Sequence, residues 1–194
     1  MVKGDRANEL LERAMDYLNR EGLEGFSLAS LAEGIGTSSR MLIYHLGSRD
    51  ELLARVQALM RKEITAEWGR RRFTQLSVAL LHNWEYYVVR IPHMQIFFHL
   101  VARSFEEPAK FVDVSSTAVS YWTDFYEDVA LREGYPIKEA QIMARLTLAM
   151  YRGLILDLTI TGDIERTSAA MERCAAMLEQ RSPRHVAAEE AAPT

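Results

Sequence analysis

Histidine, cysteine and carboxylate side chains are the groups from which a catalytic or metal site would be built, and they occur here at unhelpful spacings. His82 and Glu85 are three residues apart, whereas His93 and His99 are six apart and poorly aligned on a helix. Cys174 is the single cysteine, which rules out an intramolecular disulfide and a multi-cysteine zinc site. HExxH, Glu-x-x-His, glycine-rich phosphate-loop and nucleophile-elbow motifs are all absent from the sequence. We therefore expect no catalytic residues, no metal and no cofactor.

A second set of polar side chains is concentrated between residues 27 and 49. Ser27 and Ser38 are of a type that caps helices, and Arg40 carries a planar fork of donors that fits a phosphate or the edge of a guanine. Tyr44 and His45 add a hydroxyl and an imidazole a few residues later. Hydrogen bonding to an anionic backbone and to base edges is the chemistry that these side chains could perform.

Two short helices would hold these side chains. The residues from 27 to 34 and from 39 to 46 each predict about two helical turns, with Gly36 in the connection between them. The run Ser48–Glu51 is a capping box that opens a longer helix. Helices of two turns are not stable alone, so the flanking helices must support them. Their dimensions are those of a helix-turn-helix, in which the second helix enters the major groove of DNA.

The segment from residue 25 to residue 53 resembles the DNA-binding signature of the TetR family of bacterial transcriptional regulators. The matching positions combine caps, a turn glycine, apolar residues and an aromatic–histidine step at fixed spacing: Ser27, Leu31, Ala32, Gly36, Ser38, Tyr44, His45, Leu46 and the run Ser48–Leu53. The chain departs from the family pattern at Arg40, where glycine is frequent, and at Ile43, where tyrosine is frequent. Arg40 adds a donor for guanine or phosphate, whereas Ile43 removes a hydroxyl that would contact phosphate.

The resemblance implies which side chains of this segment would touch DNA. Base edges would be contacted by Ser39, Arg40 and Met41. Phosphates would be contacted by Ser27, Ser38, Tyr44, His45 and Arg49, assisted by backbone N–H groups at the helix starts. The two cap serines have a structural role in either case, and Tyr44 and His45 have an alternative interpretation as partly buried packing residues.

Helical periodicity continues through almost the whole chain, and no sustained strand pattern occurs. Helices, with their caps, are predicted at residues 5–20, 27–34, 39–46, 48–68, 73–90, 93–105, 111–132, 136–160 and 163–180. We therefore expect an all-α protein, which suits the nine-helix plan of the TetR family. Its predicted parts are a three-helix DNA-binding domain at 1–50, a larger helical domain for effector binding and dimerisation at 51–181, and a flexible tail at 182–194.

Aromatic side chains gather in the middle of the chain, and the resemblance implies that this part binds a small, largely apolar effector. The predicted lining residues are Trp68, Trp84, Tyr87, Phe98, Trp122, Tyr126 and Tyr151. Further apolar and polar groups that could line the same site are Met143, Leu146, Met150, Asn83, His99, Arg145 and Arg152. An ordinary helical core also contains aromatic and methionine stripes, so that alternative stays open.

The last two predicted helices are the expected dimer surface, because in the family they pair with a second copy as a four-helix bundle. Alanines cluster in the final helix, and Gly153 in the helix before it would permit a close crossing. A two-fold homodimer would present paired recognition helices to a palindromic site in double-stranded DNA. The family's usual mode is repression, relieved when the effector binds.

Charge and hydropathy are compatible with this hypothesis without indicating it. The net charge is −4, yet residues 1–72 hold twelve Lys and Arg against eleven Asp and Glu. No apolar run is long enough for a membrane span or a signal peptide, so we expect a soluble, cytoplasmic protein without a membrane partner. Two alternatives stay open: a helical dimeric interaction module without sequence-specific DNA binding and, with less support, an enzyme on a helical scaffold.

Overall fold

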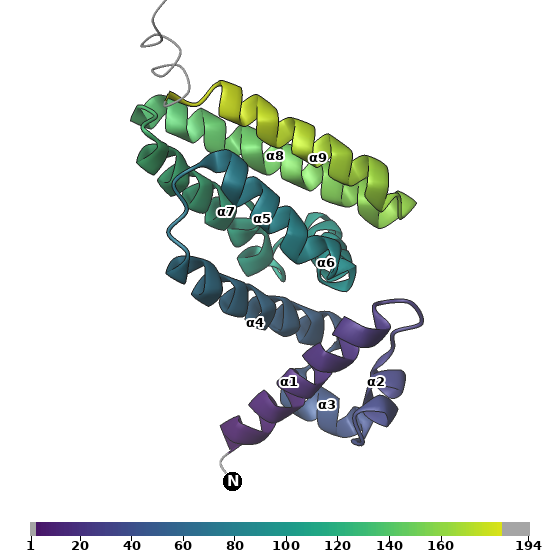
Figure 1. Ribbon diagram of the computed structural model, residues 1–194. Helices are drawn as coiled ribbons and strands as arrows, with labels where there is room; N and C mark the ends of the chain where they lie inside the picture. The colour runs from purple at the N-terminus through teal and green to yellow at the C-terminus, as the bar shows by residue number, and fades with distance from the viewer. Residues whose placement is uncertain (1–2, 184–194) are drawn as a thin grey trace, which may run out of the picture. The chain divides into compact units, whose positions relative to one another are not determined.

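The computed structural model describes residues 3–183 and is all-helical, as predicted. Within that range it contains nine helices and no strand (Figure 1). Their bounds are α1 (Lys3–Glu21), α2 (Leu28–Gly34), α3 (Ser39–Leu46), α4 (Arg49–Arg70), α5 (Leu76–Val88), α6 (Ile91–Glu106), α7 (Val112–Glu133), α8 (Ile137–Thr161) and α9 (Ile164–Gln180). Most of the predicted tail, from residue 184 onward, lies outside the described residues.

Two helix starts differ from their predictions, each for a local reason. Helix α5 begins at Leu76 rather than near residue 73, where the Glu133 carboxylate accepts a hydrogen bond from the Leu76 N–H at 2.8 Å. Helix α6 begins at Ile91, ahead of the predicted residue 93, because Pro92 occupies the first turn, where its missing N–H costs nothing.

The helices form two compact units. The first unit comprises Met1–Arg70 and Arg90–Ser115, which includes α1 to α4 and α6. The second comprises Arg71–Val89 and Ser116–Thr194, which includes α5, α8, α9 and nearly all of α7. This grouping rests on backbone contacts within each unit. The functional division predicted near residue 50 is a different one and stays a prediction.

The first unit buries a continuous apolar core that supports the two short helices. Helix α1 packs against α3, α4 and α6, and its Leu10 and Leu18 are fully buried. Leu31 of α2 and Leu42 of α3 belong to the same buried cluster. The Arg13 guanidinium of α1 donates to the Ile35 carbonyl at the end of α2. Because α2 and α3 are too short to be stable alone, this shared core is what fixes their orientation.

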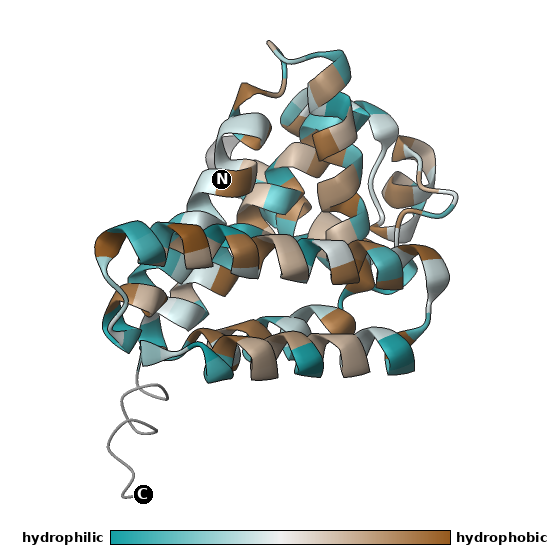
Figure 2. Ribbon diagram, turned by 90° about the horizontal axis from the view of Figure 1, so that it is seen from above, coloured by the Kyte–Doolittle hydropathy of each residue, from teal (hydrophilic) through white to brown (hydrophobic). Residues whose placement is uncertain are grey.

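The second unit packs α5 against both α8 and α9, and α8 lies beside α9 (Figure 1). The Trp84 indole N–H of α5 donates to the Ser168 hydroxyl of α9 at 3.0 Å. Hydrophobic and hydrophilic residues alternate around the helices, as expected where one face of each helix is buried (Figure 2). Across the described part of the chain, no helix has both the length and the apolar character needed to traverse a bilayer.

Candidate nucleic-acid interface and buried polar cluster

The turn between α2 and α3 is built by serine caps and one left-handed glycine. Ser27 forms a capping box with Ser30: each residue's backbone N–H donates to the other's hydroxyl at 3.0 Å. Gly36 has φ +62°, a conformation that side chains rarely adopt. The Ser38 hydroxyl accepts from the Met41 N–H at 3.3 Å and caps α3. Both cap serines remain exposed, so their hydroxyls still face solvent.

The outer face of helix α3 carries both polar and apolar side chains, and its inner face is buried. Leu42 and Leu46 point into the core, whereas Ile43 is 55% and Tyr44 is 63% exposed. Arg40 is exposed and makes no hydrogen bond or ion pair within residues 3–183. A two-turn helix that exposes large apolar residues beside an arginine is typical of a surface that meets a partner.

The three other predicted contact residues of α3 differ in how far their side chains are restrained. The Ser39 hydroxyl donates to the Leu28 carbonyl at 3.3 Å, which joins α3 to α2. Met41 is partly exposed, beside Arg40. His45 is half-buried, its ring meets the edge of the Tyr44 ring at 4.9 Å, and its Nδ1 has no hydrogen-bond partner among the described residues.

Arg49 reaches inward rather than standing free on the surface. Its guanidinium lies 5.1 Å above the Phe26 ring, and its Nη1 is 3.2 Å from His99 Nε2 and 3.5 Å from Asp50 Oδ1. This predicted phosphate contact is therefore also a link between the start of α4 and the middle of α6.

Asp50 is the centre of that link, although no local sequence pattern marks it as a functional residue. The Arg103 Nε donates to Asp50 Oδ2 at 3.0 Å, and His99 Nε2 lies 3.3 Å from Oδ1. Burial opposes ionisation of Asp50, but the hydrogen bonds from His99 and Arg103 outweigh it and hold the pKa of this carboxyl below its usual range. The partners are about 50 residues away in sequence, so no local pattern could have shown them.

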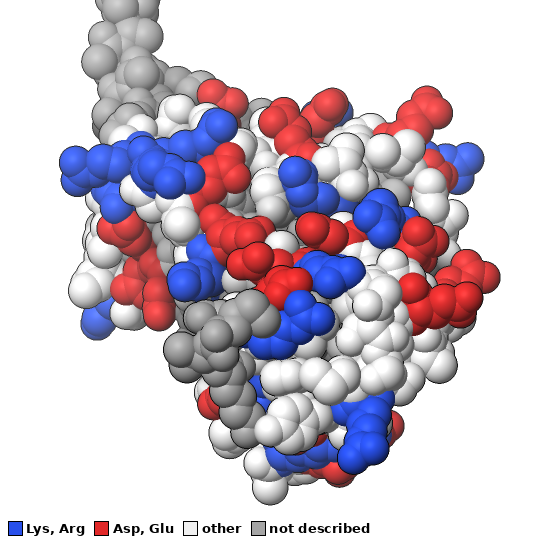
Figure 3. All heavy atoms as spheres, turned by 90° about the horizontal axis from the view of Figure 1, so that it is seen from below, with Lys and Arg blue, Asp and Glu red and all other residues white. Residues whose placement is uncertain are grey.

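Basic and acidic side chains are interspersed on the face of the molecule seen from below (Figure 3). No broad patch of one sign dominates this view, in keeping with the near balance of charges in residues 1–72.

The seven predicted effector-lining aromatics divide between the two units. Trp68, which is buried, and Phe98, which is half-buried against Phe97, belong to the first unit. The other five belong to the second unit, where Trp84 is engaged with Ser168. The remaining four surround one buried region: Tyr87, Trp122, Tyr126 and Tyr151.

That buried region contains polar groups as well as rings. The Tyr87 ring centroid is 6.4 Å from that of Trp122 and 6.0 Å from that of Tyr151. The Asn83 Nδ2 donates to the Tyr126 hydroxyl at 2.7 Å. The Arg152 guanidinium interacts electrostatically with Tyr87, Tyr126 and Tyr151 and donates to the Ala118 carbonyl of α7.

Burial determines the protonation of this cluster. It raises the pKa of all three tyrosines, so their hydroxyls are neutral donors at any physiological pH. It lowers the pKa of Arg152, which nevertheless keeps its charge because a guanidinium is not deprotonated in proteins. We name Asn83, Tyr87, Trp122, Tyr126, Tyr151 and Arg152 the tyrosine–arginine cluster.

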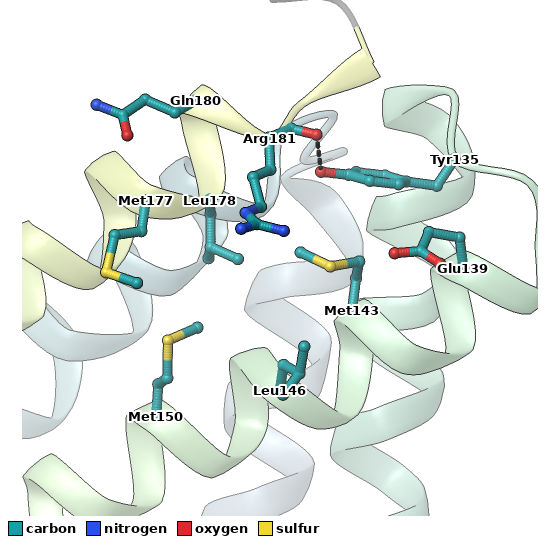
Figure 4. A pocket seen from close by; sticks show the side chains of 9 residues that line it. All are labelled: Tyr135, Glu139, Met143, Leu146, Met150, Met177, Leu178, Gln180 and Arg181. Atoms are coloured by element: carbon teal, nitrogen blue, oxygen red, sulfur yellow. Dashed lines mark hydrogen bonds between the residues drawn. The ribbon is translucent and has the colours of Figure 1, made fainter. Parts of the chain in front are cut away.

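A separate pocket of about 530 Å³ lies between α8 and the end of α9 and holds none of the seven predicted aromatics (Figure 4). Its lining is Tyr135, Glu139, Met143, Leu146, Met150, Met177, Leu178, Gln180 and Arg181. The three methionine side chains face the space between the helices, and the Tyr135 hydroxyl closes one end by donating to the Arg181 carbonyl at 2.9 Å. This apolar, adaptable pocket contains Met143, Leu146 and Met150, which the sequence suggested only as additions to the aromatic site.

Side chains that could hold a metal are not gathered anywhere in residues 3–183: no three of His, Cys, Asp or Glu come together. Cys174 is half-buried on α9, and burial raises the pKa of its thiol.

Comparison with known proteins identifies a solved structure with a similar fold. No protein-family model matches the chain, and no curated protein shows significant sequence similarity to it. Among solved structures, a transcriptional regulator from Rhodococcus sp. Rha1 is similar, with a TM-score of 0.68 and 21% sequence identity. The match covers 91% of this chain and 97% of that one. The chain therefore shares an all-helical fold with that regulator along nearly the full length of both.

Proposed function

We propose that the protein is a transcriptional regulator that binds a palindromic operator as a homodimer and is released from it by a small-molecule effector. The observation that carries the proposal is helix α3, a capped two-turn helix with Leu42 buried and with Arg40, Ile43 and Tyr44 on its exposed face. The resemblance of residues 25–53 to the TetR signature supports it. So does the shared fold with a protein described as a transcriptional regulator.

In this proposal α3 enters the major groove. Arg40, in the first turn of α3, would donate hydrogen bonds from two guanidinium N–H groups to the O6 and N7 atoms of a guanine. Tyr44, one turn later on the same side of the helix, would place its exposed ring and hydroxyl against the backbone. Ser27 and Ser38 would contact phosphate through hydroxyls and N–H groups at the two helix starts.

A dimer is supported by the exposed face of α8. Ile142, Leu146, Leu156 and Ile160 are all at least 41% exposed, and their spacing places them in one stripe along the helix. Ala149 and Gly153 fill the middle of that stripe. A Cβ built on Gly153 would meet nothing within 4 Å, so packing inside one chain does not require this glycine. The close approach of a second copy would explain it.

The test is selection of bound duplexes from a random DNA pool by the purified full-length protein at physiological salt. We expect a palindrome with half-sites centred about one helical turn (~10 bp) apart, or a multiple of that spacing. Failure to enrich any sequence, with a folded dimer in the tube, would contradict the proposal and favour the dimeric interaction module.

Substitution of Arg40 separates reading of bases from general attraction to DNA. Arg40→Ala should weaken binding to the selected site by about 10- to 100-fold and relax the preference at one base pair. The matched control is Arg70→Ala, since Arg70 is an exposed arginine in the last turn of α4. Both variants should unfold at the wild-type temperature, and equal affinities for the two would rule out the base-reading role of Arg40.

A further inference from the structure

We propose that the pocket between α8 and the end of α9 is occupied by two side chains of a second copy of this chain, the partner's Leu156 and the partner's Ile160. The inference rests on the homodimer of the proposed function and adds which residues meet across it. All nine lining residues belong to the second unit, so one compact body supplies the whole of the lining.

The pocket has a buried apolar floor and an open mouth. Met143 and Leu178 are 5% and 4% exposed and form the floor, whereas Leu146 and Met177 beside them are more than half exposed. The space of about 530 Å³ is large enough for more than one side chain. Leu146 also belongs to the exposed stripe of α8, so the pocket and the stripe form one continuous apolar surface that favours apolar groups from outside the chain.

Leu156 and Ile160 lie toward the other end of the same stripe, and their own chain does not cover them. Ile160 is 75% exposed, and Leu156, one turn earlier, is 41% exposed. These two residues are four positions apart, as are Leu146 and Met150 in the pocket, so each pair projects from one side of α8. Two uncovered aliphatic side chains thus have the same spacing as two side chains of the pocket.

Two-fold symmetry brings these pairs together. In such a dimer, a contact between residue i of one copy and residue j of the other is made twice. With the axis at Gly153 and α8 antiparallel to its copy, residues at equal distances before and after position 153 meet. Leu146 is seven residues before that position and Ile160 is seven after it. Met150 is three before it and Leu156 is three after it. A Cβ on Gly153 would meet nothing within 4 Å, so the two backbones can approach each other there.

The polar residues of the pocket favour a protein partner over a small polar ligand. Glu139, Gln180 and Arg181 are exposed, and the side chains of Glu139 and Arg181 make no hydrogen bond or ion pair within residues 3–183. Among the buried lining residues only Tyr135 is polar, and its hydroxyl already donates to the Arg181 carbonyl. The lining therefore offers no buried polar group to orient a small ligand, whereas an apolar centre with a charged rim is typical of a protein interface.

Disulfide cross-linking of the full-length protein tests this register. In a Cys174→Ser background, one copy carries Leu146→Cys and a co-expressed copy carries Ile160→Cys; both positions are more than half exposed, so the fold should be kept. Oxidation should give at least about fivefold more covalent dimer than either variant alone, because equivalent residues would be about 21 Å apart along α8 and a disulfide needs Cα atoms within about 7 Å. Ile137→Cys replaces Ile160→Cys in the matched control, since Ile137 is 62% exposed but lies off the stripe. This control should not cross-link.

Sedimentation measures how much the same contact contributes to dimerisation. Ile160→Ala should weaken the dimer by about tenfold or more, whereas Ile137→Ala should leave it unchanged. A wild-type dimer that lacks the 146–160 cross-link, or that keeps its full affinity in Ile160→Ala, would overturn the pocket contact and leave the dimeric regulator standing. A monomeric wild type would remove both. A small apolar molecule that the dimer retains in native mass spectrometry and loses in Met150→Trp would assign the pocket to a ligand and also overturn the proposal.

Discussion

Asp50 makes the strongest case for a single side chain that serves two elements. It is in the first turn of α4, where a negative charge is favoured by the helix dipole. Its carboxylate also accepts hydrogen bonds from Arg103 and His99 of α6. The same imidazole nitrogen of His99 lies 3.2 Å from the Arg49 guanidinium. A residue beside a predicted phosphate contact is thus tied to a helix outside the helix-turn-helix.

The pKa of Asp50 predicts how stability depends on pH. Because the folded-state pKa is lowered, ionised Asp50 stabilises the fold above its unfolded pKa of about 4, and this contribution is lost as the pH falls through the folded value. Asp50→Asn should lower the free energy of unfolding at pH 7 by about 1–2 kcal/mol. The difference from wild type should shrink below about pH 4.

Urea denaturation across pH measures this difference, and Asp16→Asn is its control. Asp16 is an exposed carboxylate of α1 in the same unit, and no hydrogen bond or ion pair of its side chain occurs within residues 3–183. Its substitution should change stability little at any pH. A constant gap between Asp50→Asn and wild type from pH 7 to pH 3 would show that the Asp50 carboxylate contributes no charge-dependent stability.

At the scale of elements, local chemistry made the helices predictable where caps and glycines define their ends. Ser27 caps the start of α2, Ser38 caps the start of α3, and Gly47 ends α3, as their residue types suggest. The start of α5 was not predictable in this way, because its capping carboxylate, Glu133, is 57 residues away in sequence. Local spacing likewise left the burial of Tyr44 and His45 open, and it did not show that Arg49 reaches His99 of α6.

The contact between α1 and α2 gives a prediction about Gly34. An alanine is normally preferred over glycine inside a helix by about 1 kcal/mol. At Gly34, however, a Cβ would lie 2.7 Å from Cδ2 of the Tyr17 ring and closer still to Cε2. Gly34→Ala should therefore destabilise the protein by about 1–3 kcal/mol.

A double-mutant cycle with thermal denaturation checks this steric cause. In a Tyr17→Ala background the same Gly34→Ala change should become stabilising, since the ring is gone. Gly69→Ala in α4 is the control, because a Cβ there would meet nothing within 4 Å, and it should stabilise the wild type. A stabilising Gly34→Ala in the wild-type background would mean that Tyr17 moves aside at no cost.

For the whole molecule, the sequence predicted the helices but not how they group. Aromatic residues gather in the middle of the sequence, yet Trp68 and Phe98 fall in the first unit and Tyr87, Trp122 and Tyr151 in the second. Long-range packing makes this division, and helical spacing only shows which face of each helix is apolar. The polar partners of the cluster, Asn83 and Arg152, could be suggested by type but not placed.

The proposed dimer depends on the exposed stripe of α8, and Gly153 at its middle is the position where a substitution discriminates best. Gly153 is exposed and a side chain there meets nothing within one chain, so Gly153→Glu should fold normally. Between two copies the same glutamate would bury an unpaired charge, which is strongly unfavourable. We therefore expect Gly153→Glu to be monomeric in analytical ultracentrifugation at concentrations where the wild type is a dimer.

The affinity of Gly153→Glu for the palindrome should fall along with dimerisation, because two linked heads bind far more tightly than one. Ala66→Glu adds the same charge at an exposed position of α4, outside that stripe, and should leave the dimer intact. A Gly153→Glu protein that stays dimeric would place the interface elsewhere than on α8.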